Sequence, residues 1–399
     1  MRNFDLWMPT RIVFGAGQVS RVGVEVAAIG RNAIMVTGKH SARETGLLDR
    51  AVGSLEKAGV SVTAFDRVEP NPRSATVDEG GALAGKNGCD VVIGLGGGSS
   101  MDAAKGVAVA AYDPGNIWRY VDHGDPESYV EPKKALPIVL IPTLAATGSE
   151  FNAGSVITNW ETHEKALLWA APLLFPKVSI VDPELTLTVD KDYTIDGAID
   201  IILHVMESYF NNREKTPLQD RISEGIILTV MENLPRLRHD LKDLEARTQL
   251  SWCSAMALCG IASCGRAGLG YPVHAMEHAL SGYYDISHGR GLAILVPHWM
   301  ERCYGSGPER FAQFAERVMG LPRRSGERDA ELAARGIAAW AAWMKENGAY
   351  RTLTEVGIDD SRFEVMALDT ARIYGDGKTI GGIRTLSVAD MIELYGKCL

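Results

Sequence analysis

The residues best suited to chemistry are histidines that lie close together in the second half of the chain. His274, His278 and His288 fall within fifteen residues of a sequence that contains 9 histidines. Upstream, Asp200 and His204 are four positions apart, so on a helix they share one face. One carboxylate with several imidazoles suits a divalent transition metal better than Mg²⁺ or Ca²⁺, which prefer oxygen ligands throughout. This spacing indicates a metal site between two helices.

Asp200 interrupts the apolar run 197–206, and burying its carboxylate is costly unless the group is paired or bound to a metal. His204 alone would serve as such a partner, so this pair fits a structural role as well as a metal. The downstream histidines favour the metal. If Asp200, His204 and two of the three histidines bind it, a position stays open for a substrate oxygen. The third histidine is then available for proton transfer near neutral pH.

A glycine-rich turn indicates a phosphate site in the first half of the chain. The apolar strand expected at 90–95 runs into Gly96–Ser99 and then into an alanine-rich helix. Glycines allow backbone N–H groups to approach a pyrophosphate, and the helix N-terminus adds partial positive charge. Asp102 and Lys105 would contact ribose, nicotinamide or the turn itself. The alternative is a tight turn without a ligand. Ser99 replaces the third glycine of the standard dinucleotide fingerprint, which predicts a variant sheet topology.

The loop after the strand expected at 33–37 bears on the coenzyme. An acid there would bind the ribose hydroxyls, but the chain has Gly38, followed by Lys39, Ser41 and Arg43. A glycine with nearby cations leaves room and charge for a 2′-phosphate, which favours NADP(H). The alternative is a solvated loop whose cations face water.

These residues need two kinds of architecture to position them. Strands and helices alternate up to the strand expected at 178–181, which predicts a Rossmann-like α/β domain with a mostly parallel, doubly wound sheet. A small polar run, 143–152, follows a buried strand and fits either ligand approach or ordinary helix caps. From residue 190 onward the pattern is helical. We therefore expect a dinucleotide-binding domain at 1–189 and an all-helical metal-binding and substrate domain at 190–399.

Composition restricts the partners and the compartment. The net charge of −9 argues against nucleic acid and anionic membranes. Six cysteines without CxxC pairs fit reduced thiols better than a disulfide framework or a thiolate zinc site. The first residues lack an apolar signal region, and no run approaches the ~18 apolar residues of a membrane helix. These features predict a cytoplasmic protein.

Taken together, the motifs resemble those of the iron-containing (group III) metal-dependent alcohol dehydrogenases over nearly the whole chain. The similarity rests on four segments in the same order: Gly96–Lys105, Pro142–Asn152, Asp200-x3-His204 and His274-x3-His278-x9-His288-Gly. The resemblance implies that Asp200, His204, His274 and His288 bind the metal and that His278 lies near nicotinamide and substrate. It also implies a set of coenzyme-binding positions: Asn71, Gly97, Gly98, Ser99, Asp102, Thr143, Thr147, Asn152 and Lys165.

Gly38 departs from the NAD-dependent members of that family, which carry an aspartate there. The segment 37–41 resembles the branch of NADPH-dependent aldehyde reductases and butanol dehydrogenases. We therefore expect NADP(H) in preference to NAD(H), one divalent metal (Fe²⁺, with Zn²⁺ as the alternative), and hydride transfer between small primary alcohols and aldehydes. The resemblance also implies a homodimer or larger homo-oligomer.

Three other functions fit parts of the pattern. An NAD-dependent polyol dehydrogenase of the glycerol type would use the same motifs. A metal-dependent hydrolase would need the histidines but not the glycine-rich turn. A nucleotide-sensing protein with an incomplete site is disfavoured by the complete set of four candidate ligands.

Overall fold

A computed structural model describes residues 1–268 and 270–399. The chain divides into two compact units. The sheet unit comprises Trp7–Asp190 and Leu241–Cys259, and the helical unit comprises Met1–Leu6, Lys191–Asp240 and Gly260–Leu399. The domains 1–189 and 190–399 remain a prediction, and the compact units differ from them in the N-terminal segment and in residues 241–259.

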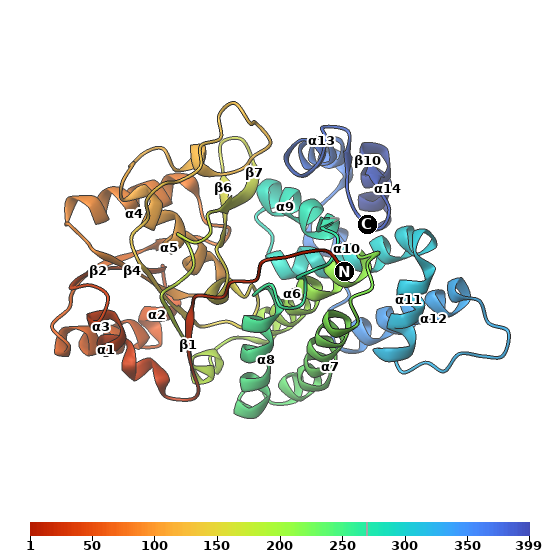
Figure 1. The fold of residues 1–399 in the computed structure, drawn as a ribbon, viewed down its shortest axis with the longest axis horizontal. Helices are drawn as coiled ribbons and strands as arrows, with labels where there is room; N and C mark the ends of the chain where they lie inside the picture. The colour runs from red at the N-terminus through yellow and green to blue at the C-terminus, as the bar shows by residue number, and fades with distance from the viewer. Residues whose placement is uncertain (269) are drawn as a thin grey trace. The chain divides into compact units, whose positions relative to one another are not determined.

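Six parallel strands form the centre of the sheet unit, in the order β1-β8-β5-β4-β2-β3 (Figure 1). Their bounds are β1 (Arg11–Phe14), β2 (Asn32–Gly38), β3 (Ser61–Val68), β4 (Val91–Gly96), β5 (Ile138–Pro142) and β8 (Val178–Val181). Strands β4, β5 and β8 are buried along their whole length, as expected for a parallel sheet covered on both faces. The predicted Rossmann-like α/β fold is confirmed.

Helices cover both faces of this sheet. The helices of the unit are α1 (Val22–Ala27), α2 (Ser41–Glu44), α3 (Leu47–Lys57), α4 (Ser74–Lys86), α5 (Gly98–Ala110) and α8 (Leu244–Ala257). On one face, α1 and α3 share a core with β2, β4, β5 and β8, and Figure 1 shows α4 and α5 on the other side. Helix α5 lies directly on β4, because a Cβ at Gly94 would be 2.8 Å from Cβ of Ala104. Strands β6 (Gly154–Asn159) and β7 (Glu164–Trp169) form a separate antiparallel hairpin.

Helix α8 belongs to the sheet unit although it lies far along the chain. Its Ser254 hydroxyl accepts a hydrogen bond from the backbone N–H of Ala146 at 3.0 Å. Arg247 donates to the carbonyl oxygen of Val189 at 3.1 Å, and the ring of Trp252 packs edge-on against Phe14. These contacts explain why residues 241–259 do not group with the other helices.

The helical unit contains the remaining helices: α6 (Lys191–Phe210), α7 (Pro217–His239), α9 (Pro272–Tyr284), α10 (His288–Cys303), α11 (Pro308–Arg317), α12 (Asp329–Glu346), α13 (Phe363–Tyr374) and α14 (Val388–Lys397). Helix α6 is buried on nearly every side, as its almost continuous apolar sequence predicts. Both α9 and α6 pack against α10. The predicted helical C-terminal half is confirmed, apart from a two-residue antiparallel ribbon of β9 (Thr379–Ile380) and β10 (Leu386–Ser387).

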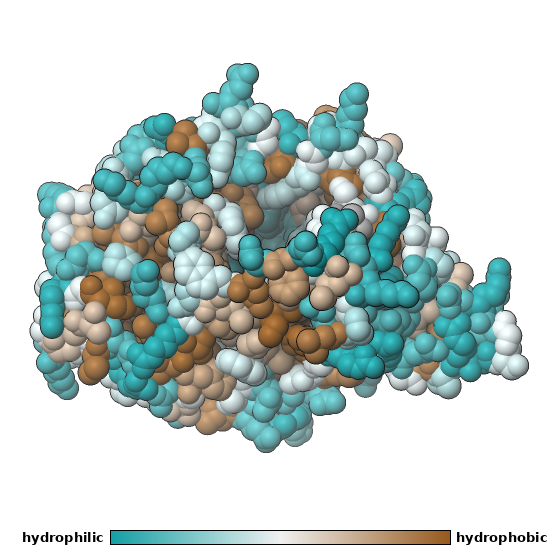
Figure 2. Space-filling model, viewed as in Figure 1, coloured by the Kyte–Doolittle hydropathy of each residue, from teal (hydrophilic) through white to brown (hydrophobic). Residues whose placement is uncertain are grey.

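The surface agrees with the composition. Apolar and hydrophilic residues are interspersed over the face shown in Figure 2. None of the described helices has the length and apolarity needed to span a bilayer. All six cysteines, which lie in the described ranges, are free thiols, and five of them are buried.

Candidate active site

Three helices of the helical unit bring four predicted ligands together. Helix α6 carries Asp200 and His204 on one face, α9 carries His274, and α10 begins at His288. The Nε2 atoms of His204, His274 and His288 lie 3.5, 3.8 and 3.7 Å from one atom, Oδ1 of Asp200. Three rings from three segments thus converge on one carboxylate oxygen.

These separations fit ligands around a shared cation better than direct hydrogen bonds. Distances of 3.5 Å and more are too long for good hydrogen bonds. Ligand atoms about 2.1 Å from a common centre in tetrahedral geometry are about 3.4 Å apart. Oδ1 of Asp200 and Nε2 of His274 are buried and have no hydrogen-bond partner among residues 1–268 and 270–399. An oxygen–nitrogen donor set of this kind fits a divalent transition metal.

The charges of the group also favour a cation. Burial alone would raise the pKa of Asp200, but His204, His288 and His274 outweigh it and lower this pKa to about 2. Burial lowers the pKa of His204 to about 4. For His274 burial is again opposed, here by Glu207 and Asp200, which raise its pKa to about 9. Carboxylates therefore outweigh burial at His274, whereas burial prevails at His204.

Two fully buried glutamates that were not predicted from the sequence pair with the Nδ1 atoms of two of the histidine rings. Glu207 accepts backbone hydrogen bonds from Val273 at 2.7 Å and His274 at 3.2 Å, and it also pairs with Nδ1 of His274. Glu277 pairs with Nδ1 of His288. Carboxylates in this position fix the orientation of metal-binding histidines. The signal was present in the sequence, because both acids interrupt apolar helical runs as Asp200 does.

His278 lies beside this group and has a different partner. Its Nδ1 is 2.5 Å from the hydroxyl of Tyr374 on α13, and its ring centroid is 5.4 Å from that of His288. The side chain is buried, and one of its ring nitrogens lies within 4.8 Å of ligand atoms of Glu277 and His288. His278 is thus a neighbour of His288, one of the three rings that face Asp200.

The predicted coenzyme residues of the sheet unit lie at the carboxyl ends of neighbouring strands. Gly38 ends β2, Gly97 follows β4, and Thr143 follows β5, while β4 pairs with both other strands. The strand order reverses here, because β3 lies beyond β2 on one side and β5 beyond β4 on the other. Nucleotides bind at this switch point in open α/β sheets.

The glycine-rich turn packs closely against the loop after β5. Gly97 caps α5, and the helix begins with Gly98 and Ser99. A Cβ at Gly98 would be 2.4 Å from Cγ2 of Thr147, so a larger residue does not fit without movement of that loop. The hydroxyl of Thr147 accepts a hydrogen bond from the backbone of Ser149 at 3.3 Å. Backbone N–H groups at the start of a helix are of the kind that binds anions, and phosphate binding at the start of α5 stays a prediction.

Two of the predicted coenzyme residues brace this loop. Asp102 accepts hydrogen bonds from the Ser149 hydroxyl at 2.7 Å and from the backbone of Val156 at 2.9 Å. Asn152 donates to the carbonyl oxygen of Gly148 at 2.9 Å. Fully buried Lys105 donates to the backbone oxygens of Ser149, Asn152 and Gly154, with the shortest distance 2.6 Å, so its partners lie in this loop and not in the glycine-rich turn named in its prediction. Coenzyme contact by Asp102 and Asn152 stays a prediction.

The remaining predicted coenzyme residues lie in two places in the sheet unit. Lys165 on β7 donates to Oδ1 of Asn71 at 2.9 Å, and both side chains are buried. Lys39 and exposed Ser41 follow Gly38, and Nζ of Lys39 is 3.4 Å from Oε1 of Glu69. Arg43, on the short helix α2 that follows, pairs with Asp66. A Cβ at Gly38 would make only ordinary contacts, the nearest at 3.8 Å, so the position has room for a side chain.

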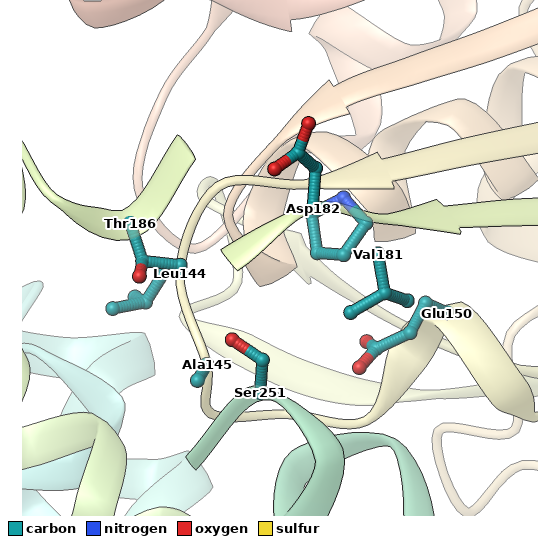
Figure 3. A pocket seen from close by; sticks show the side chains of 8 residues that line it. Leu144, Ala145, Glu150, Val181, Asp182, Thr186 and Ser251 are labelled. Atoms are coloured by element: carbon teal, nitrogen blue, oxygen red, sulfur yellow. The ribbon is translucent and has the colours of Figure 1, made fainter. Parts of the chain in front are cut away.

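A buried carboxylate behind the loop after β5 was not predicted. Glu150 lines a small cavity with Pro142, Val181, Thr186 and Ser251, and Figure 3 shows its carboxyl group pointing into the space that Ser251 also borders. Its Oε2 atom finds no hydrogen-bond partner in the described part of the chain. Burial raises the pKa of Glu150 to about 7.

Comparison with known proteins shows which family combines a sheet unit and a helical unit of this kind. The family model described as "Iron-containing alcohol dehydrogenase" matches residues 9–183, and that described as "Fe-containing alcohol dehydrogenase family, C-terminal" matches residues 194–399. The chain belongs to the iron-containing alcohol dehydrogenase family. It is therefore an NAD(P)-linked oxidoreductase, and family membership implies a metal ion, a nicotinamide coenzyme and alcohol or aldehyde substrates.

Relatives within the iron-containing alcohol dehydrogenase family differ in their coenzyme. A probable NADH-dependent butanol dehydrogenase 1 of Bacillus subtilis is 40% identical over 394 residues, covering 99% of each chain. The NADPH-dependent aldehyde reductase YqhD of Escherichia coli is 30% identical, covering 90% of this chain and 91% of that protein. A solved structure of NADH-dependent butanol dehydrogenase A from Thermotoga maritima superposes with a TM-score of 0.93 at 36% identity, covering 100% of this chain and 99% of that one.

Proposed function

We propose that this protein interconverts small primary alcohols and aldehydes by hydride transfer with NADP(H), using one divalent metal ion, Fe²⁺ with Zn²⁺ as the alternative. The observation that carries the proposal is the convergence of three imidazole Nε2 atoms on Oδ1 of Asp200. When bound, the metal supplies Lewis acidity toward the substrate oxygen, and the nicotinamide gives or accepts the hydride.

Asp200, His204, His274 and His288 are the proposed metal ligands. Glu207 and Glu277 would accept hydrogen bonds from Nδ1 of His274 and His288, which leaves the Nε2 atoms that face Asp200 as the metal ligands. Metal binding would displace the second proton that the raised pKa keeps on the ring of His274. Burial of Asp200, His204 and His274 keeps water from their ligand atoms and strengthens their interaction with a cation, while the His288 side chain is 21% exposed.

His278 is the proposed proton-transfer residue. Its Nδ1 is engaged by the Tyr374 hydroxyl at 2.5 Å, which fixes the orientation of the ring. Nε2 is then the nitrogen that exchanges a proton with the reacting alcohol or with water. An imidazole can do this near neutral pH because its ordinary pKa lies close to that range.

The proposed coenzyme site follows the ends of β2, β4 and β5. Gly97, Gly98 and Ser99 bind the pyrophosphate at the start of α5, and Thr143 and Thr147 line the same turn. Gly38 leaves room for a 2′-phosphate, toward which Lys39 and Ser41 would turn. The names of the relatives support either coenzyme, since the butanol dehydrogenases are called NADH-dependent and the aldehyde reductase NADPH-dependent. Gly38 is our reason for preferring NADP(H).

The test combines metal analysis with coenzyme-coupled reduction of butanal. Wild type should contain about one metal per chain and consume NADPH faster than NADH, while His274→Ala should lose both the metal and the turnover. His239→Ala, at an exposed position at the end of α7, is the matched control and should retain both. Full activity without bound metal would refute the metal mechanism, and a strong preference for NADH would refute the role of Gly38. Faster turnover of glycerol than of butanol would favour a polyol dehydrogenase.

A further inference from the structure

The segment Ser287–Gly291 at the start of α10 is tied to α6 by a single carboxylate. Oδ2 of Asp196 accepts a hydrogen bond from the Ser287 hydroxyl at 2.9 Å, and Oδ1 accepts one from Nε of Arg290 at 2.8 Å. Ser287 and Arg290 lie on either side of His288. We propose that Asp196 is a positioning residue that directs His288 toward Asp200, and this inference rests on the proposed metal centre.

We call Asp196 and its two partners, Ser287 and Arg290, the clamp. Helix geometry places Asp196 and the proposed metal ligand Asp200 on the same side of α6. Asp196 and Asp200 are four residues apart on that helix, so they share a face. Asp196 is 5% exposed, and the side chain of Arg290 is 15% exposed, so their ion pair is shielded from solvent. Because the Asp196 carboxylate is shielded from solvent and accepts two hydrogen bonds, it holds the start of α10 in one position against α6.

The two glycines that follow His288 allow this close approach. A Cβ at Gly289 would be 2.2 Å from the backbone oxygen of Asp196, so only glycine fits against α6 at that point. A Cβ at Gly291 would be 2.7 Å from Cγ of Glu277 on α9. The backbone around His288 is therefore held by α6, while its ring is held by Glu277. Each residue of the Ser-His-Gly-Arg-Gly motif has a contact that fixes His288.

A purely structural role for Asp196 makes a different prediction. Asp196 also places negative charge at the N-terminus of α10, which stabilises any helix. If that were its only role, its loss would lower the stability of the protein without a specific effect on metal affinity. The affinity of metal-depleted protein for a metal ion separates the two roles, and it requires no catalytic turnover.

The experiment compares Asp196→Asn with a matched control, Asp192→Asn. Asp192 also faces Arg290, at 3.6 Å, but its side chain is 66% exposed. Co²⁺ affinity is measured by competition with a chromophoric chelator. The absorption spectrum of bound Co²⁺ reports the coordination geometry. The unfolding temperature of the metal-free protein reports its stability. Asp196→Asn should weaken Co²⁺ binding about 10-fold and alter the spectrum, which is the lower end of the range for losing a residue that bonds a ligand directly, because Asp196 acts through the neighbours of His288. Asp192→Asn should bind Co²⁺ as wild type does.

Ser287→Ala removes one arm of the clamp and should weaken Co²⁺ binding by a smaller factor. Unchanged Co²⁺ affinity in folded Asp196→Asn would overturn the proposal, even if its unfolding temperature falls. If Asp196→Asn does not fold, unchanged affinity in Ser287→Ala overturns it instead. Wild-type protein that binds no Co²⁺ would overturn the metal centre and the clamp together. Wild type that binds Co²⁺ but turns over no alcohol or aldehyde would overturn the proposed function alone.

Discussion

Nε2 of His204 lies 3.5 Å from Oδ1 of Asp200, one turn away on α6, and both side chains are buried. A simple ion pair would bring these atoms to hydrogen-bond distance, especially on one helix where no long-range movement is needed. The longer separation, shared by two further histidines, leaves room for a cation among the four groups.

Glu207→Gln should reduce metal affinity without unfolding the protein. Glu207 holds Nδ1 of His274 and accepts two backbone N–H groups at the start of α9. A glutamine amide still accepts hydrogen bonds but no longer carries the charge that orients the ring and raises its basicity. We expect roughly 10- to 100-fold weaker metal binding, measured by chelator competition, with butanal reduction falling in step.

Glu232→Gln, at an exposed position on α7, is the control for Glu207→Gln and should bind metal as wild type does. Equal metal affinity in the Glu207 variant and wild type would show that the glutamate does not support His274 as a ligand.

Gly38→Asp should shift coenzyme preference toward NADH. A Cβ at Gly38 makes only ordinary contacts, so the substitution leaves the end of β2 unstrained. The new carboxylate would accept hydrogen bonds from the ribose hydroxyls of NADH and repel the 2′-phosphate of NADPH. The ratio of kcat/KM for NADPH to that for NADH should fall at least ten-fold, mainly through a higher KM for NADPH. An unchanged ratio would place the 2′-position of the ribose elsewhere.

Local periodicity paired Asp200 with His204, and the choice of His274 and His288 over His278 came from the family resemblance, whereas neither predicted the roles of the neighbouring residues. Asp200 and His204 could be paired from the sequence because residues four apart share a helix face, and the alternation of strands and helices predicted the parallel sheet. Glu207 and Glu277 were missed because their role depends on which ring nitrogen faces outward. That orientation is set by packing among α6, α9 and α10, which no local pattern reports.

Long-range contacts also explain the other differences. Asp102 and Asn152 are polar residues near a phosphate-type turn, and such residues either bind a ligand or brace the turn. The choice depends on how residues 148–156 return to α5, where their hydrogen bonds to Asp102 and Lys105 form. Similarly, the sequence of α8 predicts a helix but does not say which core the helix joins. Its contacts with Ala146 and Val189 place it in the sheet unit.

Gly98→Ala should weaken coenzyme binding and lower stability. The added methyl would be 2.4 Å from Cγ2 of Thr147, so the loop after β5 must move away from the turn that would bind pyrophosphate. Overpacking of this kind costs about 1–3 kcal/mol. We expect roughly ten-fold weaker NADPH binding, followed by coenzyme fluorescence, with a lower unfolding temperature.

Gly53→Ala is the matched control for Gly98→Ala. Gly53 lies within α3, and a Cβ there meets nothing within 4 Å. Alanine is the better helix former by about 1 kcal/mol, so stability should be unchanged or higher and NADPH binding should be normal. Normal NADPH binding by Gly98→Ala would contradict the assignment of this turn to the pyrophosphate.

Glu150→Gln should remove part of the dependence of stability on pH. Burial raises the pKa of Glu150 from an ordinary 4.5 to about 7, and nearby Asp102 acts in the same direction. The native state therefore holds this proton more tightly than the unfolded chain does. The stability that the folded protein gains from this tighter protonation of Glu150 is fully present below about pH 4.5 and is lost as pH rises through 7. Glutamine stays neutral throughout this range, so the variant should lose less stability than wild type between pH 5 and 7.5.

The pH range of this measurement is kept below 8 because burial lowers the pKa of neighbouring Lys105 to about 8, where its own titration begins to contribute. Unfolding temperatures are recorded at half-unit steps for wild type, Glu150→Gln and Glu56→Gln. Glu56 is exposed on α3, so its variant should follow the wild-type slope. The curve of Glu150→Gln should be flatter than both and should lie above wild type at pH 7.5, because the variant has no buried carboxylate to ionise. Three parallel curves would mean that the Glu150 carboxyl group titrates alike in the folded and unfolded chain.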